Sequence, residues 1–218
     1  MITFPQKLID GYRTFASQRL PTEQSRYREL SERGQSPEVM VIGCCDSRVS
    51  PEAIFDAGPG ELFVVRNIAN LVPVYQPDGG AHGVSAALEY AVSVLRIKHI
   101  VVLGHAQCGG IRAFIDKIEP LSPGDFIGRW MSMFIKPGER VEQRDRETMR
   151  DFTIRIEKAA VFRSLENLLT FPFVKTQVER GELSLHGAYF GVAEGSLFVL
   201  DKTTKEFRSV REAMEAGE

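Results

Sequence analysis

Two cysteines and one histidine in this sequence have the chemistry and the spacing of metal ligands. Cys44 directly follows the apolar run 39–42, and His105 and Cys108 follow a second apolar run at 100–103. If these runs are neighbouring parallel strands, their carboxyl ends meet at one edge of a sheet, where α/β folds place their ligand sites. Two thiolates and one imidazole suit Zn²⁺, and three protein ligands leave the fourth tetrahedral position open. The spacing therefore predicts one catalytic zinc ion per chain, bound by Cys44, His105 and Cys108.

A carboxylate and a guanidinium follow the first cysteine at alternate positions, Asp46 and Arg48. In an extended loop, side chains two residues apart point the same way, so both could face the metal. A free carboxylate beside zinc would become its fourth ligand. A bidentate bond from Arg48 would instead hold Asp46 away from the metal and leave it able to accept a hydrogen bond. We therefore expect Asp46 and Arg48 to act in catalysis.

Each of these residues also has an ordinary interpretation. A buried cysteine is most often a small apolar filler, and Cys45 is expected to be one. Of the other histidines, His82 is expected in a loop, His99 exposed before a strand, and His186 in an edge strand. The combination of three potential ligands at two strand ends favours a metal site over these ordinary interpretations.

The elements that would position the site alternate between strands and helices. The runs 39–42, 62–65 and 100–103 are continuously apolar, as is typical of strands that helices cover on both faces. Apolar residues at helical spacing predict helices over about 85–95 and 154–169. This order predicts an α/β fold, with a mostly parallel central sheet and helices on both faces.

Two further regions extend this core. Segments 183–192 and 196–200 flank a glycine turn and predict a hairpin that adds an antiparallel edge to the sheet. We expect one domain over residues 1–218, with an N-terminal helical arm at 1–34, an α/β catalytic core at 35–200 and a polar C-terminal tail at 201–218.

The composition narrows the class of protein. The chain has 218 residues, is 43% hydrophobic and has a formal net charge of −2, so it can bury a core and has no basic surplus for nucleic acid or an anionic membrane. No apolar run approaches the ~18 residues of a membrane span, and no secretory signal is evident. Three cysteines, two of them adjacent, do not form a disulfide framework. These features predict a reduced, cytoplasmic protein.

Five segments together resemble the β-class carbonic anhydrases, in their plant-like, open-site branch. The resemblance extends from about residue 30 to 200 and is carried by segments 44–48, 64–73, 87–92, 104–110 and 167–174. It implies that Cys44, His105 and Cys108 bind zinc and that Asp46 with Arg48 keeps the fourth coordination position open.

The resemblance also implies the substrate pocket. In the plant-like branch a glutamine, a phenylalanine and a tyrosine line it, and these positions correspond to Gln35, Phe63 and Tyr90. Members that bicarbonate locks in an inactive state have a tryptophan shortly before the first cysteine, where this chain has Val41. The open type is therefore expected.

The expected activity is the reversible hydration of carbon dioxide to bicarbonate and a proton, by attack of a zinc-bound hydroxide that Asp46 orients. The resemblance further implies a homodimer, with N-terminal helices extending onto the partner subunit, and assemblies of such dimers. Two alternatives stay open: hydrolysis of carbonyl sulfide or carbon disulfide at the same zinc, and a zinc-stabilised module without catalysis.

Overall fold

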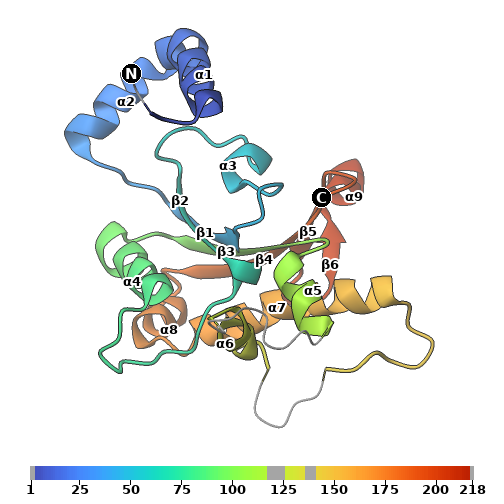
Figure 1. Ribbon diagram of the computed structural model, residues 1–218. Helices are drawn as coiled ribbons and strands as arrows, with labels where there is room; N and C mark the ends of the chain where they lie inside the picture. Colours follow the sequence, from blue (N-terminus) through green and yellow to red (C-terminus); the bar gives the residue numbers. More distant parts are fainter. Residues whose placement is uncertain (1–2, 117–125, 136–140, 217–218) are drawn as a thin grey trace.

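A six-stranded mixed sheet forms the centre of the protein (Figure 1). The computed structural model describes residues 3–116, 126–135 and 141–216. The strand order is β2-β1-β3-β4-β5-β6, and the first four strands are parallel. The strands are β1 (Val39–Cys44), β2 (Leu62–Asn67), β3 (His99–His105), β4 (Ser184–Gly191), β5 (Ser196–Leu200) and β6 (Phe207–Ser209).

This topology confirms the predicted mostly parallel sheet with an antiparallel edge. The predicted hairpin is the antiparallel pair β4–β5, in which β4 also pairs in parallel with β3, and β6 adds a second antiparallel pair beyond it. The segment expected as a polar tail also contributes structure. Its strand β6 pairs with β5, and helix α9 (Val210–Ala216) follows it.

Helices lie on both faces of the sheet, as predicted, but unequally (Figure 1). One group of helices gathers on one side of the sheet, while the N-terminal helices and α3 lie on the other. The first group contains α4 (Gly83–Glu89, continued by the π-helical Tyr90–Leu95), α5 (Gly109–Ile115), α6 (Phe126–Ser132), α7 (Met149–Leu168) and α8 (Pro172–Glu179). The second contains α1 (Gln6–Thr14), α2 (Leu20–Arg33) and α3 (Pro51–Ile54). Among the helices described, none is long and apolar enough to cross a membrane.

The strands divide their side chains between two cores. In β1, Met40 and Ile42 belong to the large cluster that also contains Val161 of α7. Val41 points to the opposite face and packs with Leu103 in a smaller cluster. Since both faces of each inner strand are buried, the runs read as continuously apolar.

Helix α7 approaches the sheet unusually closely, at a glycine of β3. A Cβ atom on Gly104 would lie 2.6 Å from Cγ2 of Val161. Any larger residue at this position would therefore push α7 away from the strand that carries His105. The absence of a side chain at Gly104 thus allows α7 to pack closely against the strand that ends at His105.

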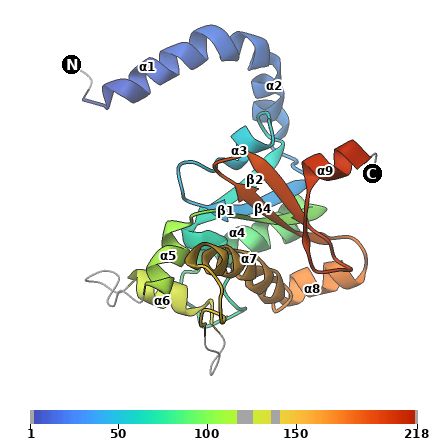
Figure 2. The ribbon, with the colours of Figure 1, turned by 90° about the vertical axis from the view of Figure 1, so that its right-hand side faces the viewer.

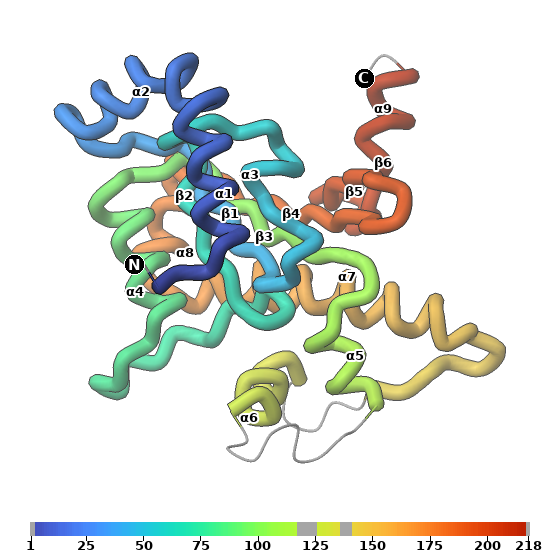
Figure 3. The backbone as a smooth tube through the Cα atoms, turned by 45° about the horizontal axis from the view of Figure 1, so that its top comes forward, coloured from blue at the N-terminus to red at the C-terminus, as the bar shows by residue number. Residues whose placement is uncertain are grey.

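The N-terminal arm stands apart from this core (Figure 2). Helices α1 and α2 contain no buried residue, and a π-helical turn over Phe15–Arg19 joins them. The exposed fractions of Leu8 and Tyr12 are 55% and 66%. With the top of the molecule tilted toward the viewer, the tube of α1 is drawn in front of the side of the sheet that carries α3 (Figure 3). The arm therefore presents apolar side chains that nothing in the described part of the chain covers.

Candidate metal centre

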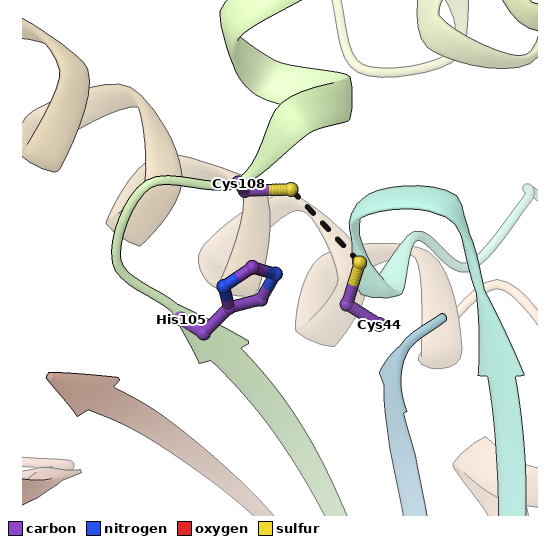
Figure 4. A group of neighbouring side chains, drawn as sticks. All are labelled: Cys44, His105 and Cys108. Atoms are coloured by element: carbon purple, nitrogen blue, oxygen red, sulfur yellow. Dashed lines mark hydrogen bonds between the residues drawn. The ribbon is translucent and has the colours of Figure 1, made fainter. Parts of the chain in front are cut away.

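The three predicted ligands converge at the carboxyl edge of the parallel sheet (Figure 4). Cys44 is the last residue of β1 and His105 the last residue of β3, and these strands are adjacent and parallel. Cys108 precedes the first residue of α5. Their ligand atoms all lie within 4.8 Å of one another, and all three residues are buried. Among the described residues, no other group of three cysteine, histidine or acidic side chains is this close.

The spacing of these atoms fits a tetrahedral zinc ion. The two sulfur atoms of Cys44 and Cys108 are 4.0 Å apart. Two Zn–S bonds of about 2.3 Å at the tetrahedral angle would separate the sulfurs by about 3.8 Å. The donor set, two thiols and one imidazole, is one that zinc prefers.

The imidazole of His105 is oriented for a metal as well. Its Nδ1 lies 2.9 Å from the backbone oxygen of Ala106, so Nδ1–H can donate there and leave the lone pair on Nε2. Nε2 is buried and has no hydrogen-bond partner in the described part of the chain. Such an orphaned nitrogen is costly, and a metal ion would satisfy it.

The two thiols are placed to share one proton, because either sulfur can donate to the other across 4.0 Å. A hydrogen bond from the Cys108 thiol lowers the pKa of Cys44 to about 4, and the same interaction raises the pKa of Cys108. One thiolate is thus stabilised before any metal arrives. A bound cation would favour the deprotonated form of both.

Asp46 and Arg48 form the bidentate pair expected from their spacing. Arg48 donates from Nε to Oδ1 at 2.9 Å and from Nη2 to Oδ2 at 2.7 Å. This interaction holds the pKa of the Asp46 carboxyl well below its usual range. The Asp46 carboxylate is not part of the three-residue ligand group. It therefore stays ionised beside the ligands rather than among them.

The pair is also tied to the second ligand-bearing turn. Nη2 of Arg48 donates to the backbone oxygen of Gln107 at 3.0 Å. Gln107 itself has φ +56°, a left-handed conformation that is strained for a residue with a side chain. The turn that carries His105 and Cys108 thus helps to fix Arg48, and through it Asp46.

Two residues that sequence reasoning missed fix the backbone of the site. Arg66 donates from Nε to the oxygen of Cys44 at 2.8 Å and from Nη2 to the oxygen of Asp46 at 2.7 Å. The predicted strand at 62–65 ends one residue before Arg66, so its place beside the Cys44 loop could have been inferred.

The second missed residue is Glu157 of α7, which is 2% exposed. Its carboxylate accepts a hydrogen bond from the Cys108 N–H at 2.9 Å and another from the Tyr189 hydroxyl at 2.7 Å. Burial raises the pKa of Glu157, although both hydrogen bonds oppose this shift. The signal in the sequence was a single acid on the apolar stripe of a long helix, in line with Ala160 and Val161.

The residues expected to line the substrate pocket lie elsewhere in the chain. Phe63 and Tyr90 do meet, with ring centroids 6.0 Å apart. However, Phe63 pairs with Met40, four residues before Cys44, which places it about 13 Å away along the strands. Gln35 is exposed in the segment between α2 and β1. The structure thus brings two of the three together, at a distance from the ligands of the same chain.

Three sequence expectations, about Cys45, His99 and His186, need correction. Cys45 is exposed and not a buried filler, because β1 ends at Cys44 and the chain turns outward there. His99 is half-buried rather than exposed, since its Nδ1 lies 3.3 Å from Nε2 of His186. His186 is not in an edge strand, because β4 lies between β3 and β5. His82 is exposed in a loop, as expected.

Comparisons with known proteins agree on one family. The carbonic anhydrase family profile matches residues 39–197. Beta carbonic anhydrase 3 of Arabidopsis thaliana is 36% identical over 208 residues, which cover 93% of this chain and 80% of that protein. Beta carbonic anhydrase 5, chloroplastic, of the same plant is 36% identical over 192 residues, which cover 88% of this chain and 62% of that protein.

Solved structures lead to the same family. The structure of the beta-carbonic anhydrase CcaA is 28% identical and superposes with a TM-score of 0.84, covering 94% of this chain and 91% of that one. A tetrameric beta-carbonic anhydrase of Sordaria macrospora is 27% identical, with a TM-score of 0.76 and coverage of 89% and 95%. The profile match includes all three clustered ligand residues and the strands that carry them. The chain therefore belongs to the β-class carbonic anhydrases, a family of lyases.

Proposed function

We propose that this protein catalyses the reversible hydration of carbon dioxide to bicarbonate and a proton, with one zinc ion bound by Cys44, His105 and Cys108. The observation that carries the proposal is the buried trio of donors, in which the His105 Nε2 lacks any partner in the described part of the chain. Three ligands with an acidic side chain held outside the group are typical of a catalytic site, whereas a structural zinc is closed by four.

Zinc in this site would supply a Lewis acid that lowers the pKa of bound water toward about 7. The side chain of Asp46 would orient the attacking water. Oδ1 of Asp46 already accepts from the Arg48 side chain and backbone N–H, whereas Oδ2 accepts only from Nη2. Oδ2 therefore has capacity to accept one more hydrogen bond, from the attacking water, and to aim that nucleophile at the carbon of the substrate.

The substrate pocket is proposed to be shared between two subunits. Phe63 and Tyr90 present an apolar pair, but they lie far from the ligands of their own chain. In a homodimer, the partner's copies of these rings and of Gln35 would form the wall that receives carbon dioxide. The uncovered N-terminal arm would then lie on the second subunit, and a tetrameric relative is consistent with further assembly of dimers.

A mixed dimer tests the shared pocket directly. One subunit would have Cys108→Ser and the other Tyr90→Ala, each with a different purification tag. If the pocket is shared, the subunit with intact ligands receives an intact Tyr90 from its partner, and half of the wild-type activity returns. Activity no higher than that of the Tyr90→Ala homodimer would show that each chain uses its own tyrosine.

Stopped-flow carbon dioxide hydration with a pH indicator tests the reaction itself, on protein of measured zinc content. Turnover is expected to rise with pH through neutrality, to disappear on chelation and to return with zinc. Absence of turnover at pH 7 and pH 9 with one zinc per chain would contradict the proposal. Carbonyl sulfide and carbon disulfide would then be assayed, and inactivity toward these as well would favour a non-catalytic module.

A further inference from the structure

A cavity of about 930 Å³ lies behind the turn that carries His105 and Cys108. It is bounded by the first half of α7 and by the turn between β4 and β5, and it reaches the backbone of Ala106 and Gln107. Its walls combine apolar side chains with basic ones: Ile154, Val192 and Phe198 with Arg150 and Lys158. The cavity is large enough for an organic molecule, since ligand sites span roughly 300–1,000 Å³.

The most informative wall residue is Lys158. Its ammonium lies over three aromatic rings, 5.4 Å from the centroid of Tyr189, 5.8 Å from Phe198 and 5.3 Å from Phe207. It forms no ion pair among the described residues, and burial alone lowers the pKa of Lys158. Aromatic faces offset only part of the cost of a desolvated cation. An anion in the cavity would offset the remainder.

The other charges around the cavity leave it basic. Arg150 has no ion pair within the described ranges, whereas Arg112 is bound to Asp116 at 2.8 Å. Glu157 is already committed to two donors, and Glu194 is exposed on the β4–β5 turn. Of the side chains that the structure describes, two cations without an ion pair, Lys158 and Arg150, therefore line the cavity, and one carboxylate without a bound donor, Glu194, lies with them. The resulting positive charge favours an anionic ligand.

The walls also define the body of the ligand. A small inorganic anion would leave the apolar side chains of Ile154, Val192 and Phe198 in contact with water. An apolar or aromatic group would cover them, at a gain of about 25 cal/mol per Å² of buried surface. The charge of the cavity and its apolar walls together favour a ligand in which an acidic group is attached to an apolar body.

We propose that this cavity binds a small organic anion, an apolar body with one acidic group, and that its occupancy alters catalysis at the metal centre. Two contacts connect the cavity to the site. Gln107 lines it and accepts a hydrogen bond from Arg48 through its backbone oxygen. Glu157 also lines it and accepts from the N–H of Cys108. A ligand that displaces either group shifts the Asp46–Arg48 pair or a metal ligand; this coupling rests on the proposed function, whereas the binding does not.

Binding is tested with 8-anilinonaphthalene-1-sulfonate, a fluorescent organic anion, on the zinc-loaded protein. Saturable binding is expected, weakened about five-fold by Lys158→Met, which keeps the length of the side chain and removes its charge. Thr153→Trp, which fills the cavity from α7, should abolish that binding phase. Lys175→Met, at an exposed position of α8, is the matched control and should bind as wild type. No saturable phase, or equal affinity in all four proteins, would overturn the proposal.

Coupling is tested by the hydration rate at saturating probe. The rate should change at least two-fold in wild type and in Lys175→Met but not in Thr153→Trp. An equal change in Thr153→Trp would mean that the probe acts at the metal instead, and no change in wild type would refute the coupling. If the protein has no hydration activity at all, the proposed function fails while the binding experiment still decides whether the site exists.

Discussion

The carboxylate of Glu157 accepts a hydrogen bond from the backbone N–H of Cys108 at 2.9 Å. This bond joins the middle of α7 to Cys108, one of the three residues proposed to bind zinc. The second carboxylate oxygen accepts from the Tyr189 hydroxyl, so the buried acid is compensated by two donors. The position of a proposed metal ligand therefore depends on a helix that itself provides none of the three.

Replacing this acid is expected to damage both stability and metal retention. Glu157→Ala leaves the buried Cys108 N–H and the Tyr189 hydroxyl unsatisfied, at a cost of about 1–3 kcal/mol for each group. Glu157→Gln retains an acceptor for the N–H and should lose less. Urea unfolding of the zinc-loaded proteins and the rate of zinc transfer to a chelator measure the two effects. Wild-type zinc retention in Glu157→Ala would show that the bond does not position the ligand.

Asp46→Asn separates metal binding from catalysis. Arg48 can still donate to one oxygen of the asparagine, and the ligand group is untouched, so zinc content should stay at one per chain. The amide presents a donor where the nucleophile needs an acceptor, and hydration should fall by about 100-fold or more. Zinc analysis and stopped-flow assays on the same preparation check this. Full activity in the variant would refute the orienting role of Asp46.

The shared proton of the two thiols predicts a persistent thiolate in the metal-free protein. Because the Cys108 thiol lowers the pKa of Cys44 to about 4, one thiolate per chain should remain at pH 6. Its absorbance near 240 nm should decline only as the pH falls toward 4. The measurement uses a Cys45→Ser background, which removes the exposed thiol, and Cys44→Ser in that background should abolish the signal. A metal-free protein without thiolate absorbance at pH 6 would contradict the proposed sharing.

Much of this architecture could be predicted because the decisive signals are local. The runs before Cys44 and His105 are apolar at every position, and this pattern correctly indicated inner strands of a parallel sheet with the ligands at their carboxyl ends. The short strand β6 gave no comparable signal. It has three residues, and Phe207 is its one apolar side chain, which packs against Tyr189 and Phe162 from distant elements.

The parts of the site that the sequence did not reveal depend on tertiary contacts. Glu157 is 49 residues from Cys108 in the chain, and only the seating of α7 over Gly104 brings the two together. The exposure of Cys45 likewise depends on where β1 ends. The role of Phe63 and Tyr90 cannot be inferred from the structure of one chain, because these residues are proposed to lie beside the ligands of a second subunit.

The last prediction concerns acid stability away from the metal centre. Arg155 donates from Nε and Nη2 to the two carboxylate oxygens of Glu147, at 2.7 and 2.8 Å, and lowers the pKa of Glu147 to about 2 from its usual 4.5. A carboxyl with a depressed folded-state pKa stabilises the fold above its unfolded pKa, and this contribution is lost as the pH falls through the folded value. Glu147→Gln should therefore lower the urea midpoint at pH 6 and 7, with a deficit that shrinks between about pH 4.5 and pH 2. Glu182→Gln, at an exposed position without an ion pair in the described part of the chain, is the control and should show no such trend. A deficit in Glu147→Gln that stays constant down to pH 2 would mean that the carboxylate charge does not stabilise this segment.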